Sequence, residues 1–293
     1  MRLLPIPISQ HLQRGALSNA VTRYQSVHHE FSALVDYGVG LIEAQAGYMP
    51  ASDRHYFAER IFGKLICHGL TLRHLSPPVA GGSANQLWDI SSVYAIGRTL
   101  IETYEALAYV ALEATSEEEH TFRILLWKLH AEERRSEMLR LIGSSHPEVP
   151  TVSANVSSFR LELLSHPWLA SAGREVERKI QRGDTPPYHL SRAERDRRAN
   201  IDNEYHTAVS MHLSSHVHTH PFSVYQLFEF QAGDAECLRL MSIPLQYSCG
   251  FLAKAIMGMR ELFSSSAPPV SPELEASVAR WEHVLRIGVK HVG

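Results

Sequence analysis

The chain has 293 residues, of which 44% are hydrophobic, so it can bury a substantial core. Its formal net charge is −3 at pH 7, which excludes an overall positive field that would attract nucleic acid. Cys67, Cys237 and Cys249 lack CxxC spacing, which argues against a disulfide framework or a thiolate zinc site.

The first fifteen residues have too short an apolar run for a secretory signal. The most apolar window, Leu240 to Met259, is interrupted by Pro244, Gln246 and Lys254, so it does not predict a membrane span. These features predict a cytoplasmic protein without a membrane partner.

Apolar residues recur at helical spacing along most of the chain. The spacing predicts helices over residues 16–47, 52–75, 88–113, 116–143, 205–220, 224–230, 234–263 and 271–290. Ser116 with Glu119, and Ser191 with Glu194, have the capping-box spacing that begins a helix. Residues 146–203 give a weaker signal, from which we expect one or two short helices among Ser- and Pro-containing turns.

We find no strand pair with hairpin residues, no glycine-rich phosphate loop and no repeat of fixed period. The sequence therefore predicts an all-α protein built as an antiparallel helical bundle. We expect a single domain over residues 1–293. It would comprise N-terminal helices at 16–143, an irregular helical insertion at 144–203 and C-terminal helices at 204–293.

Five histidines fall between Tyr205 and Pro221, on one predicted helix. A helical wheel divides this stretch by direction. It gives a buried arc of Val209, Leu213 and Val217, one flank with Tyr205, His212 and His216, and a second flank with Ser210, Ser214 and His218. The histidines therefore do not form a single cluster.

His212 and His216 have the i,i+4 spacing by which two imidazoles can reach one metal ion. Leu213 stands where an HExxH motif has its glutamate, and two ligands alone do not make a metal site. Two interpretations stay open: a metal-binding helical bundle, or histidines that form hydrogen bonds at the edge of the core. We assign no metal and no cofactor.

The segment LSSHVHTHP at 213–221, preceded by Tyr205, resembles the Tyr…Leu-Ser-x-x-Val-His-x-x-Pro signature of an uncharacterised group of bacterial helical proteins. Arg98-Thr-Leu-Ile-Glu102 resembles the Arg-x-x-x-Glu signature of the same group. That group is similar to HEPN domains (higher eukaryotes and prokaryotes nucleotide-binding). The resemblance implies a HEPN-like bundle that forms a homodimer and binds RNA or a nucleotide.

The resemblance selects Arg98, Glu102, Ser214 and His218 as catalytic candidates, with Tyr205 in support. In a shared cleft, Glu102 could orient His218 and Arg98 could hold a phosphate. The alternative is an ordinary solvated ion pair between Arg98 and Glu102. The Arg-to-His spacing of HEPN nucleases occurs at several places in the chain but in neither segment, so the enzymatic assignment is left open.

Three functional hypotheses follow. The first is a HEPN-like protein that binds a nucleotide or RNA phosphate, with metal-independent ribonuclease activity of a toxin or antiphage type. The second is a non-enzymatic interaction or regulatory protein whose histidines are structural. The third is the metal-binding bundle with His212 and His216.

Overall fold

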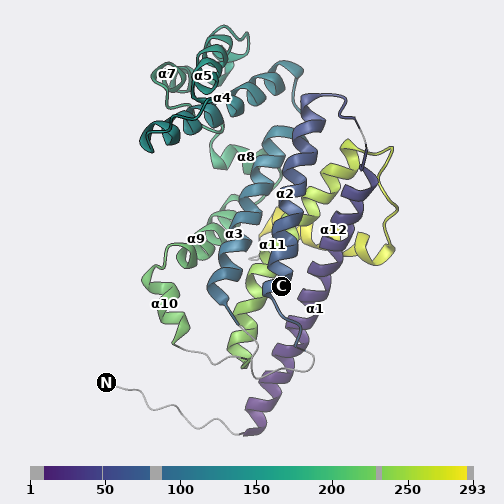
Figure 1. The fold of residues 1–293 in the computed structure, drawn as a ribbon. Coiled ribbons are helices and arrows are strands. Elements are labelled where there is room, and N and C mark those ends of the chain that lie inside the picture. Colours follow the sequence, from purple (N-terminus) through teal and green to yellow (C-terminus); the bar gives the residue numbers. More distant parts are fainter. Residues whose placement is uncertain (1–9, 48, 80–87, 229–232, 289–293) are drawn as a thin grey trace.

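The structure is a computed structural model that describes residues 10–47, 49–79, 88–228 and 233–288. These residues form helices and no strand, so the all-α prediction is confirmed for the described chain (Figure 1). The helices are α1 (Gln10–Ala44), α2 (Asp53–Leu75), α3 (Ile90–Leu107), the π-turn η1 (Ala108–Leu112), α4 (Glu117–Leu141), α5 (Val149–Leu164), α6 (Leu169–Ala172), α7 (Arg174–Arg182), α8 (Arg192–Arg198), α9 (Asn203–Val217), α10 (Pro221–Leu227), α11 (Ala235–Leu262) and α12 (Pro272–Ile287).

Long helices from both halves of the chain form the main bundle. α11 packs against α1, α3 and α12, while α2 packs against α3, as Figure 1 shows. The core includes Leu34, Leu65, Leu100 and Phe251, each fully buried. No described helix is long and apolar enough to cross a membrane.

α3 approaches α11 closely at Gly97. A methyl group at position 97 would lie 3.2 Å from Pro244 Cβ, and Ser248 Oγ would be 3.7 Å away. Glycine therefore allows these helices to approach more closely than a larger residue would. This contact positions the middle of α3 against the middle of α11.

The predicted helix starts agree with the observed caps. Ser116 accepts a hydrogen bond from the Glu119 amide, and Ser191 accepts one from the Glu194 amide. Asp234 caps α11 in the same way, through the Cys237 amide. The predicted ends at Phe230 and Lys290 lie outside the described residues.

Residues 117–182 form a lobe of four helices, α4 to α7, at the top of Figure 1. Its own apolar cluster includes Phe122, Leu126, Leu163 and Ile180. Residues 146–203, for which the sequence predicted one or two short helices, contain more helix than expected, because the 16-residue α5 packs along α4. α4, which the sequence grouped with the N-terminal helices, thus shares this lobe with α5 and α7.

A buried histidine joins α3, α8 and α9 near the lobe. His206 is fully buried, with Nδ1 2.7 Å from Asp196 Oδ1 and Nε2 3.0 Å from Glu105 Oε1. Glu105 also lies 2.9 Å from Arg195 Nη2, and Asp196 accepts a hydrogen bond from the Asn203 amide group. These side chains hold three helices together through charges removed from water.

A second charged group joins η1, α4 and α8. The fully buried Arg123 donates hydrogen bonds to Glu113, Glu119 and the carbonyl of Tyr109. Arg198 reaches Glu119 from α8, at 2.6 Å. Each charge thus has an opposite charge from another part of the chain, which offsets much of its cost of burial.

His206 should make the stability of the fold depend on pH. Burial lowers the pKa of His206, but the hydrogen bond to Asp196 and the charges of Asp196 and Glu105 outweigh burial and raise it. Arg195 and Arg192 also lie next to Glu105, and the ring of Phe251 packs against His206. The stabilisation that charged His206 provides is complete below pH 6.5, the ordinary pKa of histidine. It decreases as pH rises through the raised pKa of His206.

We therefore expect His206→Gln to lower the free energy of unfolding by about 3–5 kcal/mol near pH 6, because Glu105 and Asp196 lose their shared cation. Urea unfolding at pH 6 and pH 9 measures this difference, which should be smaller at pH 9. The exposed His220, changed to Gln, is the matched control and should have little effect at either pH. An equal loss of unfolding free energy at pH 6 and pH 9 would contradict a charged His206.

Candidate functional site

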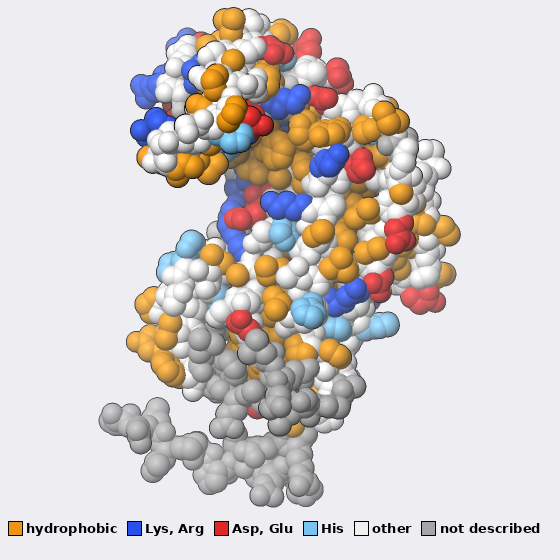
Figure 2. Space-filling model, viewed as in Figure 1, with side chains coloured by type: hydrophobic (Ala, Val, Ile, Leu, Met, Phe, Trp, Pro, Cys, Tyr) orange, Lys and Arg blue, Asp and Glu red, His pale blue; other side chains and the backbone are white. Residues whose placement is uncertain are grey.

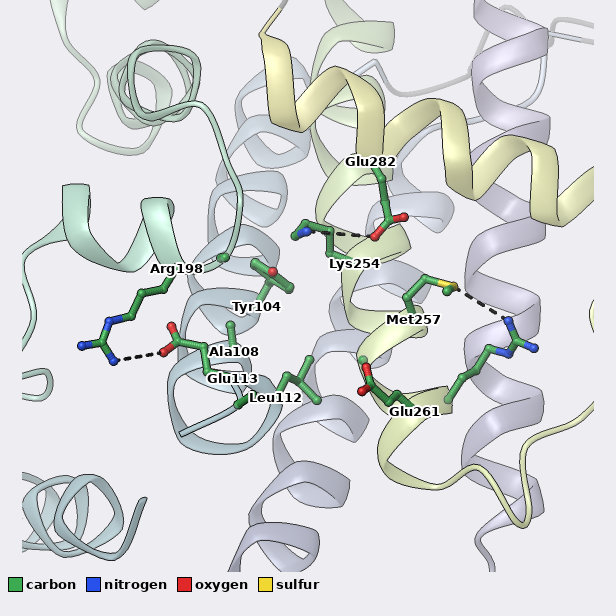
Figure 3. Close-up of a pocket in the computed structure, with 13 residues that line it drawn as sticks. Tyr104, Ala108, Leu112, Glu113, Arg198, Lys254, Met257, Glu261 and Glu282 are labelled. Atoms are coloured by element: carbon green, nitrogen blue, oxygen red, sulfur yellow. Dashed lines mark hydrogen bonds and ion pairs between the residues drawn. The ribbon is translucent and has the colours of Figure 1, made fainter. Parts of the chain in front are cut away.

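A cavity of about 770 Å³ lies between η1, the end of α8, α11 and α12 (Figure 3). Cavities of this size commonly hold small molecules and cofactors. Its walls carry three carboxylates and three cations, with Tyr104, Ala108, Leu112 and Met257 between them. The charged residues of the wall are Glu113, Glu261, Glu282, Arg198, Lys254 and Arg260.

Lys254 is the most unusual residue of this wall. It lies in the C-terminal half of α11, among buried apolar residues, and its side chain is 17% exposed. Among the described residues, only Glu282 brings a carboxylate oxygen within 4.0 Å of Nζ, at 4.0 Å. Since this separation exceeds a normal hydrogen bond, the ammonium group retains donors that a ligand could use.

Burial lowers the pKa of Lys254, while the charge of Glu282 acts in the opposite direction. In Figure 3 the Lys254 side chain points toward the space beside Tyr104. Tyr104 is almost fully buried, and its pKa is raised by burial and by neighbouring carboxylates. The phenol is thus a neutral hydrogen-bonding group beside a cation.

Glu113 provides a carboxyl group on the other side of the cavity (Figure 3). Burial raises its pKa, although Arg123 and Arg198 oppose the change. Glu113, with a raised pKa, and Lys254, with a lowered pKa, thus line one cavity. Each shift favours the uncharged form of the group. Such pairs are typical of sites that bind or transfer protons.

Of the two arginines of the cavity, Arg198 is held by carboxylates, whereas Arg260 has only a weak contact with a methionine sulfur. Arg198 lies 2.6 Å from Glu119 Oε1 and 3.0 Å from Glu194 Oε1. Arg260 donates to the Met257 sulfur at 3.8 Å. The buried Nε of Arg260 has no hydrogen-bond partner in the described structure. Lys254 and Arg260 are therefore the cations of this wall that a ligand could still engage.

The predicted pair Arg98 and Glu102 also lies on α3, but neither residue lines the cavity. Arg98 Nη2 is 2.6 Å from Glu102 Oε1, with the arginine mostly buried and the glutamate half exposed. Arg98 Nη1 is buried and has no hydrogen-bond partner in the described structure. This guanidinium therefore keeps a donor available.

His218 and Ser214 lie at the end of α9. His218 is exposed and stacks on His220, with ring centroids 5.6 Å apart. No hydrogen bond, ion pair or ring contact in the described chain joins the side chains of His218 or Ser214 to Arg98 or Glu102. The exposed apolar residues of α10, Phe222 and Tyr225, lie nearby in sequence, and Figure 2 shows hydrophobic side chains over this helix.

The flank with His212 and His216 faces the protein interior. Tyr94 packs between them, with its ring 5.1 Å from His212 and 4.0 Å from His216. His216 pairs with Gln226, and His212 lies 3.4 Å from the Tyr247 hydroxyl, next to which Tyr205 also packs. Within the described residues, no group of three or more His, Cys, Asp or Glu side chains could hold a metal ion.

Sequence reasoning missed three residues that matter in this part of the fold. Lys254 was noted only as an interruption of an apolar window, although a lysine at that position is itself a signal of a specific environment. Glu113 and His206 gave no local signal, since their partners lie on other helices. Only the folded chain brings these groups together.

Comparisons with protein-family models, with curated proteins and with solved structures found no match to this chain. The relationship to HEPN domains that residues 98–102 and 213–221 suggest therefore stays a prediction.

Proposed function

We propose that this chain binds a small molecule with a phosphate or carboxylate group in the cavity between η1, α8, α11 and α12. The supporting observation is Lys254, a largely buried cation that faces a cavity of about 770 Å³ and whose nearest carboxylate among the described residues is 4.0 Å away. An anionic group at Nζ would supply the hydrogen bonds that this lysine lacks, and such charge-assisted bonds are strong.

The remaining walls favour a ligand with further polar groups. Tyr104 can exchange a hydrogen bond beside Lys254, and Glu113 and Glu261 can accept from hydroxyl or amino groups. A nucleoside monophosphate combines these features and suits a cavity of this size. AMP is therefore a suitable probe for the polar part of the cavity.

Lys254→Met tests this function because it removes the charge and keeps the length of the side chain. Isothermal titration with AMP and with inorganic phosphate should show at least about tenfold weaker binding for this variant, the cost of one charge-assisted hydrogen bond. Binding to the unmodified chain should weaken as pH rises, beginning below the ordinary lysine value of 10.5.

Lys128→Met is the matched control, since Lys128 is more exposed and pairs with Asp53 at 2.7 Å, outside the cavity. It should keep the affinity of the original chain. Lys254→Met should also keep its melting temperature, because it replaces a largely buried cation with an apolar side chain. Equal affinities for both variants, or no binding to the original chain, would contradict the proposal.

We propose the nucleotide or RNA phosphate site at Arg98 as a second candidate. It is favoured by the buried Nη1 of Arg98, which has no hydrogen-bond partner in the described chain. HEPN-like ancestry, a homodimer and metal-independent RNA cleavage of a toxin or antiphage type belong to this candidate. They derive from the resemblance of residues 98–102 and 213–221.

For this second candidate, Arg98→Ala and His218→Ala should each lower cleavage of a mixed RNA pool by at least about tenfold, since general acid–base catalysis contributes this much or more. His218 is exposed, so its removal should leave the melting temperature nearly unchanged. His220→Ala, at the adjacent exposed histidine, should cleave normally. Identical cleavage by all three variants would assign the activity to another group or to a contaminant.

A further inference from the structure

A smaller pocket of about 160 Å³ adjoins the cavity on the side of α12. The two spaces share Met257, Arg260 and Glu282 in their walls. The smaller pocket is otherwise lined mainly by apolar residues of α1, α11 and α12. They include Tyr37, Ile256, Leu274 and Val278.

Met257 and Arg260 stand between the two spaces. Their side chains meet through the contact of Nη1 with Sδ at 3.8 Å, which Figure 3 shows at the edge of the cavity. Methionine is unbranched and flexible, so it can change rotamer at little cost. Among the described residues neither forms a salt bridge, and Arg260 also interacts with the Tyr37 hydroxyl, where it opposes the rise in pKa that burial causes.

We infer that the ligand of the cavity is amphiphilic, with an anionic group at Lys254 and an apolar chain that passes Met257 into the smaller pocket. This inference rests on the proposed function and specifies its ligand. A cation on one side of Met257 and an apolar pocket on the other match the two ends of such a molecule. A carboxylate or phosphate with an alkyl or aryl chain is therefore the expected class.

The volume of the pocket sets the length of the chain that it can take. At ~30 Å³ for each water-sized group, it admits about five methylenes. Each methylene buried from water should lower Kd about three- to fourfold. Affinity should then stop increasing once the pocket is full.

The experiment is an NMR titration of the full chain with linear carboxylates from acetate to octanoate, with inorganic phosphate as the head-group probe. We expect Kd to fall by about three- to fourfold per methylene and to level off after about five. Ala279→Phe places a ring at the wall of the smaller pocket and should remove this dependence on chain length, while acetate and phosphate bind as before.

Ala276→Phe is the matched control. Ala276 is also an exposed alanine of α12, but it lines neither space, so this variant should keep the dependence on chain length. If acetate and phosphate bind through Lys254 and the chain adds no affinity, the amphiphilic ligand is wrong and the proposed function stands. If neither probe binds, or Lys254→Met binds both unchanged, the proposed function fails as well.

Discussion

Charges removed from water determine how the lobe, α8 and α9 are joined to the bundle. His206 lies between Asp196 and Glu105, and Arg123 lies between Glu113 and Glu119. Loss of one partner would leave a buried charge uncompensated, which is among the most destabilising changes in a protein. The position of α8 is therefore fixed by its charged partners as well as by its apolar contacts.

The same buried charges also contribute one wall of the cavity. Glu113 comes directly after η1, and its carboxylate is held toward Arg123 and Arg198 on the side of the lobe. Lys254 faces the cavity from α11, where Glu282 is its one carboxylate neighbour among the described residues. The Glu113 carboxylate on one wall is thus paired with arginines of the chain. On the opposite wall, Lys254 can still bind a ligand. This asymmetry distinguishes the cavity from the paired charges at the junction.

Local signals predicted much of the fold. Ser116, Ser191 and Asp234 are followed by the helices they cap, because capping depends on the few residues around each start. The helix at 149–164 was missed as a long element, since only Val152 and Leu163 of it are buried and three serines interrupt its apolar spacing. Val217 was expected in the core but is 44% exposed, because α9 ends there.

The candidate site was less predictable, for a different physical reason. The environment of His206 comes from Glu105 and Asp196, and helical spacing on α9 cannot reveal either partner. The wheel did separate His212 and His216 from His218, and the first two contact Tyr94 whereas the third stacks on His220. Spacing gives the direction of a side chain, whereas its pKa and available donors depend on the helices that it meets.

The packing of α1 against α11 has a consequence for the order of folding. α1 ends at Ala44 and α11 begins at Ala235, so 190 residues separate two helices that pack against each other. Most helical bundles fold quickly because their contacts are local in sequence, whereas contacts between distant segments slow folding. During synthesis, the apolar face of α1 cannot pack against α11 until α11 has left the ribosome. Until then, chaperones can bind this face.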